Sequence, residues 1–189
     1  MNRKQLNNFV LLTLFVALIL LLGFTPLGLI PLGFINVTIL CIPVVVGTLY
    51  MGPKNGLILG LAFGAVSFLN AMMKPSALVS TLMGSSPLMV FVMSILPRLM
   101  VPLVCWGVFR LVSRFNGHAA TAAAAVLGSL TNTALYLGLM LLFYILCGID
   151  TAGVLSLIGG TALIAGTAEA VAAAVLCTPI LAALRRVRK

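Results

Sequence analysis

The sequence predicts an all-α membrane protein, a bundle of six transmembrane helices with both termini in the cytoplasm. Of its 189 residues, 62% are hydrophobic and 7% are charged, whereas soluble domains carry about 25% charged residues. The apolar residues form long continuous runs, unlike the short alternating segments of a membrane β-barrel. These observations exclude a soluble enzyme, a nucleic-acid-binding domain and a disordered chain. We expect residues 1–189 to form a single transmembrane domain in the lipid bilayer.

The predicted spans are runs that approach the about 20 residues needed to cross about 30 Å of hydrocarbon. They are Phe9–Phe24, Val37–Tyr50, Gly56–Asn70, Leu88–Leu111, Ala122–Leu146 and Leu155–Leu184. The second and third runs are short, so Val37–Asn70 is also compatible with a re-entrant hairpin. The residues between them include Gly52 and Pro53, a strong turn signal. No small-residue cleavage site follows the first run, which we therefore interpret as a retained helix and not a signal peptide.

The distribution of basic residues predicts the orientation. Six spans place both termini on one side, and nine of the 11 basic residues fall on that side: Arg3, Lys4, Lys54, Arg110, Arg114, Arg185, Arg186, Arg188 and Lys189. On the opposite side there is only Lys74, and Arg98 falls within a span. Because cytoplasmic loops are enriched in Lys and Arg, the side with both termini is predicted to be cytoplasmic. The two longer external loops, residues 25–36 and 71–87, are unusually apolar; they either lie at the interface or fold over a pocket, and we favour the second interpretation.

The chain lacks the common signatures of catalysis and of metal binding. Its four cysteines are scattered without a C-x-x-C pair, so we expect neither disulfides nor a metal site. No P-loop is present, and His118, the single histidine, is predicted in a cytoplasmic turn. We therefore expect no enzymatic activity and no cofactor.

Two charged residues fall deep inside predicted spans, Arg98 in the fourth and Glu169 in the sixth. Such residues are costly in hydrocarbon and usually face the interior of the bundle at a functional site. At about 1.5 Å per residue from the external ends, Arg98 lies about 15 Å deep and Glu169 about 20 Å deep. Asn132 lies at a similar depth in the fifth span, and Tyr136 is one turn further out on the same face. Ser94 stands in the same relation to Arg98, so polar residues of three helices are expected to converge.

Two interpretations of these residues remain open. In the first, Arg98 and Glu169 form a structural ion pair and Asn132 holds helices together. In the second, some of these side chains are ligands for a small polar solute.

A second pattern is the series Gly56, Gly60 and Gly64 in the third span. Glycines at this spacing allow helices to approach closely. The partner helix is either part of this chain or part of another membrane protein.

Several segments resemble one family of membrane proteins when taken in order. These are Ile42–Gly47, Gly52–Gly56, Gly60, Phe63–Gly64 and Ser67, followed by Leu96–Arg98 and Gly128–Thr133. Together they resemble the S components of energy-coupling factor (ECF) transporters over most of the chain. The resemblance implies a small subunit in a prokaryotic cell membrane that captures a vitamin from outside. It also implies a transmembrane coupling protein and two cytoplasmic ATPase subunits as partners, which agrees with the missing P-loop.

Within this family, Leu96–Arg98 and Thr131–Thr133 look most like the pantothenate-type S components. A vitamin of this type would offer a carboxylate to Arg98 and amide and hydroxyl groups to Asn132, Tyr136 and Ser94. We expect Glu169 and Asn36 to complete this substrate site. The resemblance implies docking on the coupling protein through Ala17 and the glycines Gly56, Gly60 and Gly64. Many S components show A-x-x-x-A in the first helix, whereas Ala17 here has Thr13 before it and Leu21 after it. A membrane scaffold and a stand-alone carrier are the alternative functions, although we find no inverted repeat of the carrier type.

Overall fold

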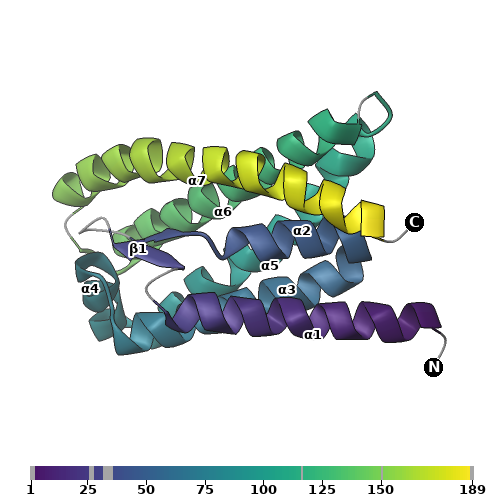
Figure 1. Cartoon of the computed structure of the whole chain (residues 1–189). Coiled ribbons are helices and arrows are strands. Elements are labelled where there is room, and N and C mark those ends of the chain that lie inside the picture. Colours follow the sequence, from purple (N-terminus) through teal and green to yellow (C-terminus); the bar gives the residue numbers. More distant parts are fainter. Residues whose placement is uncertain (1–2, 26–27, 32–35, 116, 150, 188–189) are drawn as a thin grey trace.

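The computed structural model describes residues 3–25, 28–31, 36–115, 117–149 and 151–187. Its elements are α1 (Arg3–Phe24), β1 (Leu29–Pro31), β2 (Asn36–Thr38), α2 (Cys41–Met51), α3 (Pro53–Met73), α4 (Ala77–Ser85), α5 (Pro87–Val112), α6 (Gly117–Leu146) and α7 (Ala152–Val187). The long helices run side by side, and the two ends of the chain lie at one end of the bundle (Figure 1). The short helix α4 and the β-hairpin lie at the opposite end.

The predicted multi-pass helical fold is confirmed, but six spans are not. Within the described ranges, five helices are long and apolar enough to cross a membrane, namely α1, α3, α5, α6 and α7. The second predicted span was expected to begin at Val37. Instead, residues 36–38 form β2, which pairs antiparallel with β1, and the 11-residue helix α2 begins at Cys41. At about 1.5 Å per residue, α2 is about 16 Å long, which is too short to cross a bilayer on its own.

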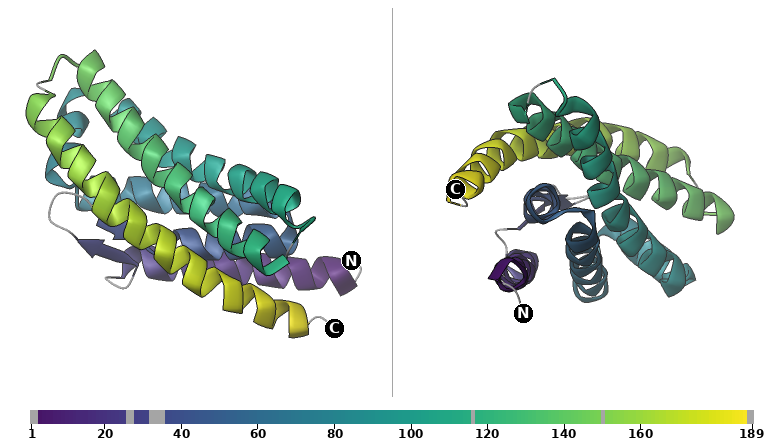
Figure 2. Two further views of the ribbon diagram at one scale, coloured as in Figure 1. Left: turned by 90° about the horizontal axis from the view of Figure 1, so that it is seen from above. Right: turned by 90° about the vertical axis from the view of Figure 1, so that its right-hand side faces the viewer.

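Helix α2 is nevertheless the centre of the bundle. Residues Cys41–Leu49 are all buried, and the end-on view shows α2 surrounded by the longer helices (Figure 2). Gly52 ends this helix with a φ of 93°, a conformation that glycine adopts without steric cost. Pro53 then starts α3, where its missing N–H costs nothing. The predicted turn between the second and third apolar runs is therefore a tight helical hairpin.

The glycine series of α3 packs against α5 of the same chain. Gly56, Gly60 and Gly64 are all buried. A β-carbon at Gly60 would lie 2.6 Å from the carbonyl oxygen of Arg98, and one at Gly64 would lie 3.1 Å from Cα of Ile95. In this structure the close approach that the glycines permit is therefore used within the chain. Gly56 packs on Thr48 of α2 and Pro102 of α5, and Gly60 and Gly64 pack on α5. The docking role that the resemblance implied for these glycines stays a prediction.

Two apolar clusters stabilise the bundle. One surrounds α2 and includes Val44, Val45 and Phe63. The other joins α4, α5 and α6, where the Tyr144 hydroxyl donates a 2.6 Å hydrogen bond to the carbonyl oxygen of Leu78. This bond attaches α4, which lies within the apolar loop 71–87, to the end of α6. A polar pocket lies between the two clusters, with walls from both.

Candidate functional site

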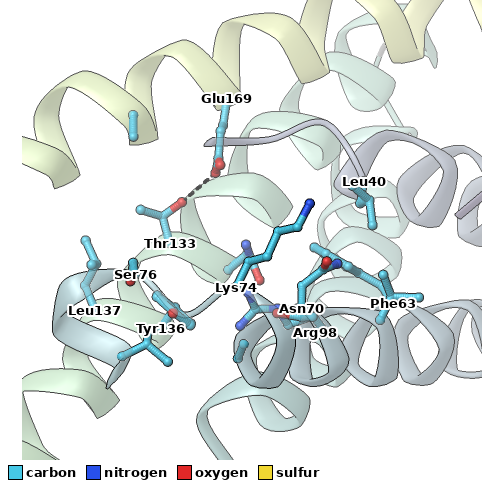
Figure 3. A pocket seen from close by; sticks show the side chains of 16 residues that line it. Leu40, Phe63, Asn70, Lys74, Ser76, Arg98, Thr133, Tyr136, Leu137 and Glu169 are labelled. Carbon is cyan, nitrogen blue, oxygen red and sulfur yellow. Dashed lines mark hydrogen bonds between the residues drawn. The ribbon is translucent and has the colours of Figure 1, made fainter. Parts of the chain in front are cut away.

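One pocket gathers most of the polar side chains that the sequence singled out (Figure 3). Its walls come from α3, α5, α6 and α7, from Leu40 just before α2, and from residues 74–79 around the start of α4. The polar members of this lining are Ser67, Asn70, Lys74, Ser76, Arg98, Asn132, Thr133, Tyr136 and Glu169. Because α4 and the α3–α4 turn contribute to it, the pocket lies toward the end of the bundle opposite the chain termini.

Arg98 is positioned by the proline that precedes it. In an α-helix, the N–H of residue 97 would bond to the carbonyl of Met93, but Pro97 has no N–H to donate. The Arg98 guanidinium instead donates a 3.0 Å hydrogen bond from Nη1 to the Met93 carbonyl oxygen. Pro102 likewise has no N–H for the carbonyl of Arg98, and this carbonyl faces Gly60 of α3. Pro97 thus leaves the Met93 carbonyl to the guanidinium, and Pro102 leaves the Arg98 carbonyl without a helical partner where α5 contacts Gly60 of α3.

Two aromatic rings hold the Arg98 guanidinium from α6 and from α3. Its Cζ lies 4.6 Å from the centroid of the Tyr136 ring and 5.3 Å from that of Phe63. Cation–π contacts of this kind are attractive and strengthen when the charge is removed from water. The side chain is 6% exposed, so it is both buried and restricted in rotation. Tyr136 was expected to bind the solute. In the structure its ring contacts the Arg98 guanidinium and thereby helps to orient it.

Buried polar atoms without partners mark the same part of the pocket. Arg98 Nε and Asn132 Oδ1 are buried and make no hydrogen bond within the structure. Buried donors and acceptors are nearly always paired, and an unpaired one costs about 1–3 kcal/mol. A donor and an acceptor left open in the walls of one pocket are therefore complementary to the polar groups of a ligand.

Glu169 lies on the opposite wall and takes a different partner from Arg98. Its Oε2 accepts a 2.9 Å hydrogen bond from the Thr133 hydroxyl of α6. The side chains of Arg98 and Glu169 are both buried and line the same pocket. The two interpretations of this pair, a structural ion pair and a ligand site, make different predictions for variants of Arg98.

The structure places the other predicted residues as follows. Ser94 is buried, but among the described residues it is not part of the pocket lining, and its carbonyl oxygen packs near Gly64. Asn36 belongs to β2, and its side chain lies outside the described part of the structure. Ala17 is exposed on α1. Of the six predicted site residues, Arg98, Asn132, Tyr136 and Glu169 meet in the pocket.

Sequence reasoning missed several members of the lining. Lys74 follows the last residue of α3, is exposed, and extends its side chain across the pocket (Figure 3). Its only signal in the sequence was that it is the single basic residue of the predicted external loops. Thr133 is adjacent to Asn132 in the Gly128–Thr133 motif, but the sequence alone gave no reason to place its side chain in the site. Asn70 donates a 2.8 Å hydrogen bond to the carbonyl of Gly23 and thereby attaches α3 to α1 as well as lining the pocket.

Comparisons with known proteins agree with this architecture. Residues 7–182 match the family described as the substrate-specific component of the ECF transporter. The chain is also 27% identical over 200 aligned residues to the pantothenic acid transporter PanT of Lactococcus lactis subsp. cremoris (strain MG1363), an alignment that covers 100% of this chain and 98% of that protein. Proteins of the matched family are membrane components of a transporter and not enzymes. The chain therefore belongs to the family of ECF transporter substrate-specific components, as the order of its sequence motifs predicted.

Proposed function

We propose that this protein binds pantothenate from the external side of a prokaryotic cell membrane and delivers it through an ATP-driven ECF module. The family assignment supports a substrate-binding role in uptake, and the relative PanT supports the choice of vitamin. The observation that carries the proposal is the buried Arg98 guanidinium, which has an unpaired Nε and shares its pocket with an unpaired Asn132 oxygen.

Pantothenate matches these groups by its chemistry. It carries one carboxylate, a central amide and two hydroxyl groups. Arg98 supplies a cation with N–H donors for the carboxylate, and a charge-assisted bond of this type is stronger than a neutral one. Asn132 Oδ1 and the Glu169 carboxylate are acceptors for the amide N–H and the hydroxyl groups. Leu40, Val66 and Leu137 offer apolar contact to the carbon skeleton.

Calorimetric titration of the purified protein with pantothenate and with panthenol tests this assignment. Panthenol has an alcohol in place of the carboxylate and is otherwise the same molecule. We expect pantothenate to bind more tightly than panthenol by on the order of 2–5 kcal/mol, because Arg98 would lose its charged partner. The variant Arg98→Gln should bind the two compounds with similar affinity. Equal binding of both compounds to the unmodified protein would reject a carboxylate site at Arg98.

We propose that α1 is the helix that contacts the coupling protein. Ala17, Thr13 and Leu21 lie on one side of this helix at a spacing of four residues, and all three are exposed. The partners on this proposal are a transmembrane coupling protein and two cytoplasmic ATPase subunits. The variant Ala17→Trp should bind pantothenate normally, but it should neither copurify with the coupling protein nor support uptake into vesicles. Leu18→Trp, a substitution at an exposed position of α1 outside this four-residue series, is the matched control and should do both.

The orientation remains part of this proposal. Cysteines introduced at the exposed residues Ser80 and Thr81 of α4 should react with a membrane-impermeant reagent in intact cells, whereas one at Ser113 should react only after lysis. The reverse labelling pattern would place the pocket on the cytoplasmic side and contradict capture from outside.

A further inference from the structure

A second cavity, of about 300 Å³, lies between the start of α6 and the end of α7. Thr121 of α6 and Thr178, Ala182, Arg185 and Arg186 of α7 are among its lining residues. It is at the end of the bundle where both chain termini lie (Figure 1). Arg185 is 16 residues from Glu169 along α7, about 24 Å at helical rise, so this cavity is separate from the substrate pocket.

No carboxylate side chain is among the described residues that line this cavity. The sequence contains two acidic residues, Asp150 and Glu169. Glu169 lines the other pocket, and Asp150 falls in the sequence between the end of α6 and the start of α7. Arg185 and Arg186 therefore give the lining of this cavity a net positive charge. An anionic ligand would balance that charge.

Arg185 is held in place by an aromatic ring. Its Cζ lies 5.2 Å from the ring centroid of Phe109 on α5. A guanidinium stacked on a ring keeps its N–H edges available for planar, paired hydrogen bonds, the geometry that suits phosphate oxygens. Arg185 and Arg186 are both exposed, and the contact with Phe109 orients the Arg185 guanidinium at one wall of the cavity.

An exposed apolar stripe continues from the cavity along α7. Val171 and Val175 are 62% and 63% exposed, and their spacing of 7 and 3 residues from Thr178 places them on the face of α7 that carries Thr178 and Ala182. This stripe runs from the arginines toward the middle of a predicted span. A charged cavity followed by an apolar track matches a molecule with an anionic head and a hydrocarbon tail.

We propose that the α6–α7 cavity binds a phosphate group, and that its source is the headgroup of an anionic phospholipid. The arginines bind the phosphate, and the acyl chains lie along Val171 and Val175. Basic pockets between membrane helices bind anionic headgroups by the same electrostatics. This site does not depend on the identity of the transported vitamin.

Native mass spectrometry of the full chain tests the site. The protein is transferred from nanodiscs of phosphatidylcholine with phosphatidylglycerol, and retained lipids are counted. We expect one phosphatidylglycerol to be retained in preference to phosphatidylcholine. The double variant Arg185→Gln/Arg186→Gln should lower the affinity for it by roughly 30-fold, at about 1 kcal/mol for each arginine.

Two further variants separate a cavity from general surface charge. Arg110→Gln/Arg114→Gln removes the same charge from exposed positions outside the cavity lining and should retain the lipid. Ala182→Phe fills the cavity, leaves every charge in place and should lose the lipid. Equal loss in the two double variants, or normal retention in Ala182→Phe, would overturn the site. Thermal unfolding of each variant in detergent verifies that it is folded.

A last measurement distinguishes a lipid headgroup from free inorganic phosphate as the source of the phosphate group. In detergent without added lipid, the thermal unfolding midpoint is measured with phosphatidylglycerol and with inorganic phosphate. Stabilisation by the lipid alone, lost in Arg185→Gln/Arg186→Gln, supports the proposal. Equal stabilisation by inorganic phosphate would overturn the assignment to a lipid, and stabilisation by neither would overturn the site itself.

Discussion

Arg98 and Lys74 are two cations that line one pocket, yet their surroundings differ. Arg98 is 6% exposed, stacks on Tyr136 and Phe63, and donates to the Met93 carbonyl. Lys74 is exposed and lies beyond the last turn of α3, at the mouth of the same pocket. A buried, preoriented charge interacts strongly because water does not screen it, whereas an exposed one is screened and mobile.

This contrast suggests that the two residues affect different steps of ligand binding. A desolvated partner of a ligand carboxylate mainly slows dissociation, whereas an exposed charge at a mouth mainly speeds association. We therefore predict that Arg98 determines how long pantothenate stays bound and that Lys74 determines how fast it arrives.

Loss of Arg98 should have the largest effect on binding. Arg98→Ala should weaken pantothenate binding by about 2–5 kcal/mol, because the carboxylate would be buried without a charged partner. Arg98→Lys, which keeps the charge but loses the planar fork, should bind with an intermediate affinity. Titration calorimetry gives the affinities. If Arg98 serves only to neutralise Glu169, Arg98→Ala should instead lose thermal stability and Arg98→Ala/Glu169→Gln should regain it.

Gly60→Leu should displace Arg98 through the backbone contact between α3 and α5. Its side chain would meet the carbonyl of Arg98 on α5, so α3 and α5 would have to separate. Overpacking of this kind costs about 1–3 kcal/mol of unfolding free energy, and pantothenate binding should weaken with it. Gly84→Leu, at a glycine with open space around it, is the control. Normal stability of Gly60→Leu in thermal unfolding would show that α3 and α5 accommodate the larger side chain and would contradict this prediction.

Asn132→Ala should have a smaller effect than loss of Arg98. The amide oxygen is a neutral acceptor with no partner in the protein, so its removal should cost about 1–3 kcal/mol of ligand binding. Stability should be unchanged or slightly higher, because an unpaired buried acceptor is removed. A loss of stability without a loss of affinity would assign Asn132 to helix packing, as one sequence interpretation held.

Lys74→Gln should change affinity least and kinetics most clearly. We expect association of pantothenate to slow by a few-fold at low salt and to be nearly unaffected at high salt, since exposed charges are screened within about 10 Å at 0.1 M ionic strength. Dissociation should change little. Stopped-flow binding at several salt concentrations measures both rates. Faster dissociation with an unchanged association rate would show that Lys74 also holds the bound ligand, and would contradict the proposed difference between the two residues.

Part of the pocket was predictable because it follows from position along helices. Arg98 and Glu169 stand out as charges within apolar runs, and Asn132 and Tyr136 share a helical face by spacing alone. Ser94 was predicted by the same spacing rule, but it is buried outside the lining of the pocket, with its carbonyl oxygen near Gly64 of α3. Lys74 was not predicted, because its position depends on how the α3–α4 turn folds back over the pocket.

A multi-pass helical membrane protein with few charges inside its spans could be recognised from the amino-acid sequence, because hydropathy and helical periodicity act locally along the chain. The motifs at Leu96–Arg98 and Gly128–Thr133 also indicated the family. The three-dimensional packing was needed to show that residues 36–38 pair as a strand and that the helix starting at Cys41 is too short to span. It also decided that the carbonyl freed by Pro102 faces Gly60. These features depend on contacts between segments distant in sequence, whose packing no local pattern encodes.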